Sequence, residues 1–129
     1  MHIRRSILLA AATLILVTVA LTGCSKKDSG PTGPGSSVTF NSGNILSGLG
    51  FQFVFATEGH YAYHCAIHTQ MQSTIHVVAG GLDTLHVNIA NSTSSGFQPV
   101  AVGGETNVRP GGRVIWTNVT GQTHTVTSD

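Results

Sequence analysis

Apolar and polar residues alternate over short runs from residue 38 onward, which is the pattern of half-buried β-strands. In the first run, Phe51, Phe53 and Phe55 alternate with Gln52 and Val54. Each of four later runs places a single row of residues on one strand face: Tyr61, Tyr63 and Cys65; Ile75 and Val77; Leu85, Val87 and Ile89; Val114, Trp116 and Asn118. We expect a last strand over residues 124–127.

Turn-forming residues separate these runs. Glycine, proline and small polar residues cluster at 57–59, 79–81, 91–96 and 110–112, where we expect turns, tight connections or loops. No stretch after residue 24 has the period of an amphipathic helix. Many short strands at this spacing predict an all-β domain, built as an antiparallel sandwich or barrel.

The N-terminal residues predict an export signal. Arg4 and Arg5 precede an apolar run from Ile7 to Leu21, and small residues follow it, as in a secretory signal. The run ends in Leu-Thr-Gly-Cys, which resembles the lipobox of bacterial lipoproteins and implies that Cys24 becomes the lipidated first residue of the mature chain. An uncleaved membrane helix is the alternative, but this run of 15 residues is shorter than the roughly 20 that span a bilayer.

The expected domain organisation follows from these segments and from the composition. Residues 1–23 are the signal peptide, residues 24–37 are the lipidated cysteine and a flexible Gly/Pro/Ser tether, and residues 38–129 are one folded domain. The formal net charge of the 129-residue chain is only +1, which provides no basic surface for a nucleic-acid partner. We expect a monomer held at a membrane by its lipid.

The segment after the second predicted strand carries the strongest chemical signal. Cys65, His68 and Met71 form the motif C-x-x-H-x-x-M. Soft sulfur donors combined with imidazole favour copper, and a copper–thiolate site takes two histidines and one cysteine in a plane with a methionine on the axis. A second histidine must therefore come from elsewhere, and His124, at a loop-to-strand junction, is the best candidate.

Other interpretations of these residues stay open. His64, Cys65 and His68 would also suit zinc, and Met71 would also serve as a core residue. Four histidines lie on strand faces opposite the apolar rows, and we expect them to face solvent: His60, His64, His76 and His86.

The same residues resemble the small blue copper proteins, the cupredoxins, and within them the plastocyanin and amicyanin group. The step from His68 to Met71 is similar to the amicyanin ligand loop. Residues 110–118 and 124–126 resemble the family's first-ligand region, and residues 97–99 resemble its Phe-x-Pro loop near the metal. The resemblance implies an antiparallel Greek-key β-sandwich that holds one mononuclear copper ion through four ligands: His124, Cys65, His68 and Met71.

The two halves of the chain stand in the opposite order from the family. The segment similar to residues 83–127 comes first in the family, and the segment similar to residues 38–78 follows it. We interpret this order as a circular permutation in which residues 79–82 join the former ends; a truncated or shuffled reading frame is the alternative. A permutation requires the strand ending at Asp129 to lie beside residues 38–40.

Ile67 stands where the plastocyanin and amicyanin loops usually carry proline. Its backbone N–H, which proline lacks, is expected to donate a hydrogen bond to the sulfur of Cys65. Such a bond would raise the reduction potential of the copper ion.

Four protein ligands leave no position in the metal plane for a substrate, so we expect electron transfer and no enzyme activity. The resemblance implies that the edge of His68 is the port for electrons, where redox protein partners dock transiently. The signal implies a lipid-anchored protein facing the periplasm or another extracytoplasmic space of the bacterial cell envelope. Two other functions stay open: a copper-binding or copper-delivery lipoprotein without a redox role, and a metal-free sandwich for adhesion or assembly.

Overall fold

The computed structural model describes residues 38–129, which contain six β-strands and no helix. The strands are β1 (Gly50–Phe55), β2 (Gly59–His64), β3 (Gln72–Ile89), β4 (Phe97–Val100), β5 (Val108–Asn118) and β6 (Thr127–Ser128). The all-β prediction is therefore confirmed. The expected signal peptide, tether and lipidated Cys24 lie outside the described residues. Within residues 38–129, no helix has the length and apolar character needed to cross a membrane.

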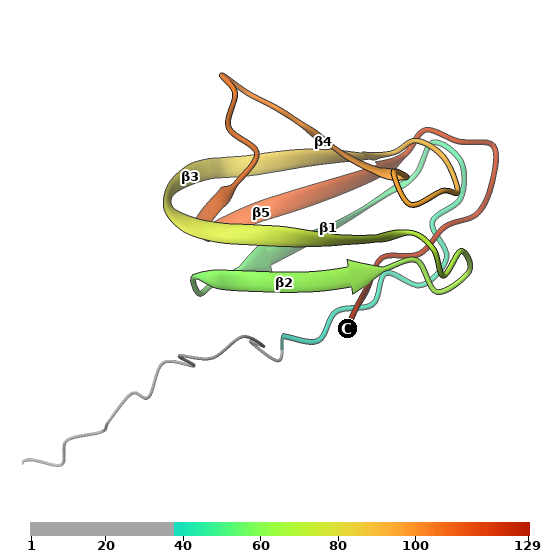
Figure 1. Ribbon diagram of the computed structural model, residues 1–129, viewed down its shortest axis with the longest axis horizontal. Helices are drawn as coiled ribbons and strands as arrows, with labels where there is room; N and C mark the ends of the chain where they lie inside the picture. The colour runs from blue at the N-terminus through green and yellow to red at the C-terminus, as the bar shows by residue number, and fades with distance from the viewer. Residues whose placement is uncertain (1–37) are drawn as a thin grey trace, which may run out of the picture.

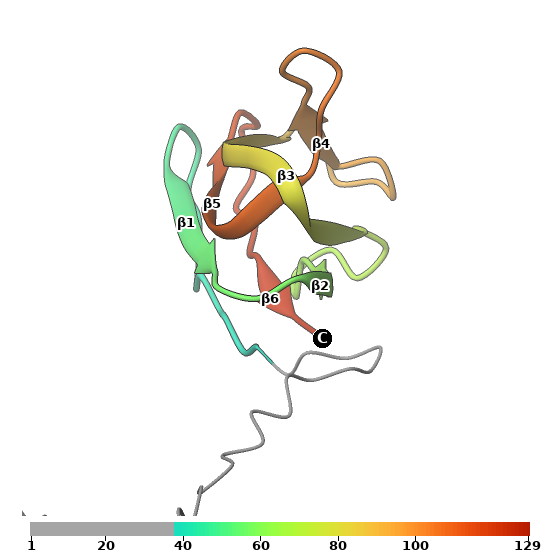
Figure 2. The same cartoon turned by 90° about the vertical axis from the view of Figure 1, so that its left-hand side faces the viewer.

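The strands form one sheet in the order β1-β5-β3-β2-β6, with β4 paired to β3. Figure 1 shows the strands wrapped around a common interior, and Figure 2 shows how strongly the sheet curls, in the manner of a half-barrel. Residues 84–89 of β3 run parallel to residues 113–118 of β5. The sheet is therefore mixed, and the expected antiparallel arrangement is wrong for the β3–β5 pair. β3 and β5 are not consecutive, so no hairpin forces them to run in opposite directions.

β3 is a single strand of 18 residues, whereas the sequence predicted two strands with a tight connection at residues 79–81. The glycines there bend the strand without ending it. Gly80 has a φ of 84°, and a Cβ on Gly81 would lie 2.6 Å from the backbone of Val108. Glycine thus serves here for a bend and a close backbone approach, which a sequence pattern does not distinguish from a turn.

The turn predicted at residues 110–112 is also replaced by strand. These residues lie inside β5, where Gly111 has a φ of 78° and a Cβ on Gly112 would lie 2.6 Å from Cγ2 of Val108. The last strand is shorter than expected, because β6 holds only Thr127 and Ser128. His124 is instead joined to Ile45 by an isolated antiparallel bridge.

The predicted apolar rows do face the interior. Phe55 is fully buried and Phe51 and Phe53 are half-buried, while the rows of the other predicted strands are buried throughout. Phe40 packs among the aromatic rings, with its centroid 5.0 Å from Phe53 and 6.0 Å from Trp116. The first described residues therefore cover the open side of the curled sheet.

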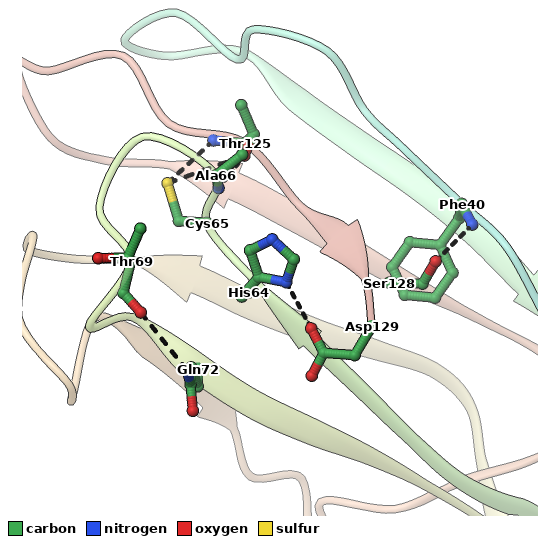
Figure 3. A network of polar contacts seen from close by, with 9 residues as sticks. All are labelled: Phe40, His64, Cys65, Ala66, Thr69, Gln72, Thr125, Ser128 and Asp129. Atoms are coloured by element: carbon green, nitrogen blue, oxygen red, sulfur yellow. Dashed lines mark hydrogen bonds and ion pairs between the residues drawn. The ribbon is translucent and has the colours of Figure 1, made fainter. Parts of the chain in front are cut away.

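The two ends of the described chain lie side by side. Ser128 N donates to the carbonyl oxygen of Phe40 at 3.0 Å, and Phe40 N donates to Ser128 Oγ at 3.1 Å, as Figure 3 shows for the second bond. Asn41 and Thr127 pair next to them. The adjacency that we expected between the C-terminal strand and residues 38–40 is present.

Candidate metal centre

The loop between β2 and β3 carries three of the predicted ligands. The antiparallel pairs of the β2–β3 hairpin continue to His64 and Gln72, so Cys65 begins the loop and Met71 ends it. Cys65 N donates to the carbonyl oxygen of Met71 at 3.0 Å, and Met71 N donates to that of His68 at 2.8 Å. These bonds close the loop into a compact turn at one end of the sheet.

His124 meets this loop from the far end of the chain. Cys65 Sγ lies 3.6 Å from Nδ1 of His68 and 3.8 Å from Nδ1 of His124. The metal-ligating atoms of the three residues all lie within 4.8 Å of one another. A thiol and two imidazoles from distant parts of the sequence are thus close enough to bind one metal ion, as the motif and the resemblance predicted.

The alternative trio that includes His64 is wrong. Strand alternation places His64 on the opposite face of β2 from Tyr63 and Cys65, and its Nδ1 contacts the carboxylate of Asp129, as Figure 3 shows. Among the described residues, the one group of three or more acidic, cysteine or histidine side chains with metal-binding spacing is Cys65, His68 and His124.

Burial sets the electrostatics of the centre. Cys65, Met71 and His124 are fully buried, while His68 is partly exposed. Burial lowers the pKa of His124, and the neighbouring imidazole of His68 lowers it further. The lowered pKa favours the neutral imidazole, which is the form that binds metal ions.

Thr125 holds the sulfur and the loop in place. Its backbone N–H donates to Cys65 Sγ at 3.3 Å, its hydroxyl lies 3.9 Å from the same sulfur, and the hydroxyl oxygen accepts the N–H of Ala66 at 2.7 Å (Figure 3). The backbone donor to the sulfur is therefore Thr125 and not Ile67, whose expected bond is replaced. The sequence signal for Thr125 was its place next to His124, a candidate ligand.

Nε2 of His124, the ring nitrogen farther from Cys65, also has a hydrogen-bond partner. His124 Nε2 lies 3.0 Å from the hydroxyl of Thr120, and its backbone exchanges two hydrogen bonds with Ile45 at 2.8 and 3.2 Å. The buried side chain of Asn118 donates to the carbonyl oxygens of Ile45 and Gln122. These contacts fix the position and the ring orientation of His124.

Met71 is packed tightly beside the same loop. Its side chain is fully buried, and a Cβ on Gly96 would lie 2.5 Å from its Cε. Phe97, in the Phe-x-Pro segment, is buried against Tyr63 with ring centroids 4.7 Å apart. Met71 therefore sits where the loop meets residues 91–97, and its role as an axial ligand stays a prediction.

Comparison of the chain with protein families, with curated proteins and with solved structures finds no match. The curled all-β sheet and the Cys–His–His group are therefore the observations from which a function has to be inferred. Both belong to residues 38–129.

Proposed function

We propose that the protein is a type 1, blue copper protein that carries single electrons between redox partners in the bacterial cell envelope. The observation that carries the proposal is the convergence of Cys65, His68 and His124 within 4.8 Å. One thiolate and two imidazoles, with a methionine available for a weak axial bond, are the donors of blue-copper electron-transfer sites. Met71, buried in the same loop, supplies that methionine.

The surroundings of the centre favour electron transfer over catalysis. Thr125 and Thr120 hold the sulfur and one imidazole from outside the ligand set, so the ligands keep their places when the charge of the ion changes. All the donors belong to the protein, which leaves no position for a substrate. The partly exposed ring of His68 is the route for electrons and the centre of a transient docking surface.

We extend the proposal to the fold, as a circularly permuted Greek-key sandwich of the cupredoxin kind. The bonds between Phe40 and Ser128 support it, because they join residues that would be continuous in an unpermuted chain. The uninterrupted course of β3 through residues 79–82 supports it too, since former ends joined there need no added loop. Anchoring to a membrane by a lipid on Cys24 rests on the sequence of residues 1–24.

Copper delivery is the second candidate function. His68 is the one partly exposed member of the trio, so an incoming partner can reach a ligand of the ion directly. A delivery protein would bind Cu(I) and release it, and it would need no reversible redox chemistry.

Copper reconstitution of the detergent-solubilised protein separates these functions. Adding Cu(II) should produce an intense blue thiolate-to-copper absorption and a reversible one-electron wave in voltammetry. Cys65→Ser should abolish the colour, while His76→Ala, a matched change at an exposed histidine, should leave it intact. Colourless but tight Cu(I) binding would favour delivery, and a lack of metal uptake at Cys65, His68 and His124 would favour a sandwich without a metal centre.

A further inference from the structure

A second pair of histidines lies on the outer face of the β2–β3 hairpin. His60 of β2 and His76 of β3 are directly opposite each other in the antiparallel register. Their ring centroids are 4.5 Å apart and the rings are nearly perpendicular, at 82°. Both side chains are exposed, so solvent ions reach them without any change in the fold. Figure 1 shows the two strands side by side.

Within residues 38–129, neither ring has a hydrogen-bond or ion-pair partner; the ion-paired histidine of this hairpin is His64, which contacts Asp129. The next cross-strand pair on the same face is Ala62 with Thr74, which brings no charge. Apart from the contact with each other, the two imidazoles are available to a ligand from solution.

The spacing of the two ring centroids is compatible with bonds from both rings to one metal ion. Two imidazoles bound to one ion at about 2.0–2.1 Å have centroids about 4.5 Å apart when the bonds meet at about 90°, and about 5.2 Å apart at a tetrahedral angle. The observed centroid distance of 4.5 Å is closer to the value for a right angle than to the tetrahedral value. Right-angled nitrogen and oxygen ligation is typical of Cu(II) and Ni(II), and Cu(II) binds such donors more tightly than Ni(II) does.

We propose that His60 and His76 form a second metal site that binds Cu(II) at two adjacent corners of a square plane, with solvent completing the coordination. The site has no sulfur ligand and does not depend on the function proposed for Cys65. Five residue steps along the chain separate His60 from Cys65, or about 16 Å of extended strand, so the two sites share no ligand.

Copper titration of the full-length protein, followed by electron paramagnetic resonance, tests the second site. The spectrum should show a tetragonal Cu(II) signal with nitrogen coupling, in addition to any signal from the Cys65 centre. His60→Ala and His76→Ala should each remove the tetragonal signal and reduce the copper bound by one ion per chain. His86→Ala, at an exposed histidine of the same strand as His76, should leave both quantities unchanged.

The outcomes distinguish the two proposals. If the Cys65 centre takes no copper, the tetragonal signal should still appear and still require both His60 and His76. A tetragonal signal that survives either substitution would overturn the second site. A measurement on the unchanged protein gives an independent check: substoichiometric Cu(II) should broaden the ring proton resonances of His60 and His76 before those of His86. Equal broadening of all three would also reject the site.

Discussion

Two histidine pairs in this protein have nearly the same spacing and very different surroundings. The ring centroids of His68 and His124 are 4.6 Å apart, and those of His60 and His76 are 4.5 Å apart. His68 and His124, the inner pair, have the buried thiol of Cys65 near their nitrogens. His60 and His76, the outer pair, face solvent on an outer strand face.

The two pairs differ in the surrounding contacts that would hold the imidazoles in a fixed geometry around an ion. Two imidazoles at this distance can both reach one ion, so spacing alone does not set the two pairs apart. Burial of His124 and its bond to Thr120 fix the inner pair before any ion arrives, so the protein imposes the geometry. The outer pair has no such supports, and an ion bound there would impose its own preferred geometry on the side chains.

The largest expected difference between the pairs is in the blue absorption. His124→Ala removes a ligand from the inner pair and should abolish the absorption of the copper-loaded protein. His60→Ala, the equivalent change in the outer pair, should leave it at full intensity. Visible spectra at matched copper loading test both variants, and a blue His124→Ala protein would show that His124 is not a ligand.

A substitution in the tightly packed region around Met71, next to the inner pair, should have the second-largest effect, on the stability of the fold. A Cβ at Gly96 would lie 2.5 Å from Met71 Cε and 2.4 Å from the carbonyl oxygen of Asn91, so Gly96→Ala should destabilise the protein by about 1–3 kcal/mol through overpacking. Gly121 has no atom within 4 Å of that position, and Gly121→Ala is the matched control. Chemical denaturation measures both free energies of unfolding; equal values would contradict the tight packing around Met71.

The hydroxyl behind His124 should affect metal affinity by a smaller amount. Thr120→Val removes the partner of Nε2 and should weaken binding at the inner site by about 10- to 100-fold. Thr120→Ser keeps the hydroxyl and should restore most of the affinity. Competition with a chelator measures the change, and copper binding at the outer pair should not respond to either variant.

The smallest expected effect is on the pH dependence of stability. Burial lowers the pKa of His124 in the folded protein, so the unfolded chain takes up a proton that the folded chain does not. The metal-free protein should therefore lose stability as the pH falls through about 6.5, by about 1.4 kcal/mol for each unit by which the pKa is lowered. Between about pH 8 and pH 5, the free energy of unfolding should fall less for His124→Gln than for the unchanged protein. An identical fall in both proteins would contradict the lowered pKa of His124.

Local patterns were sufficient to predict the apolar rows of the main strands and to single out the candidate ligands of one loop. The alternation around Phe53, Tyr61 and Leu85 is set by the two-residue repeat of a strand, and Cys65, His68 and Met71 lie close in sequence. His124 was harder, because Cys65 lies 59 positions away; its place at a loop-to-strand junction made it a candidate, and the resemblance to known copper proteins strengthened that prediction.

Features that depend on distant contacts were missed or mistaken. The parallel pairing of β3 with β5 and the bend at Gly80 depend on how separate segments pack, which alternation along one strand does not reveal. The same is true of Thr125, whose bond to the sulfur joins residues 60 positions apart. The pairing of His60 with His76 depends on the hairpin register, and a shift of one residue would have moved one ring to the other face.

The pairing between residues 40–45 and 124–128 has a practical consequence for anyone who trims this protein. The backbone of His124 is bonded to Ile45, and the ring of Phe40 fills a place among the aromatic side chains. A shortened version that begins after Ile45 would lack these contacts although all four candidate ligands would still be in its sequence. An N-terminal deletion should therefore keep Val38 and all the residues that follow it.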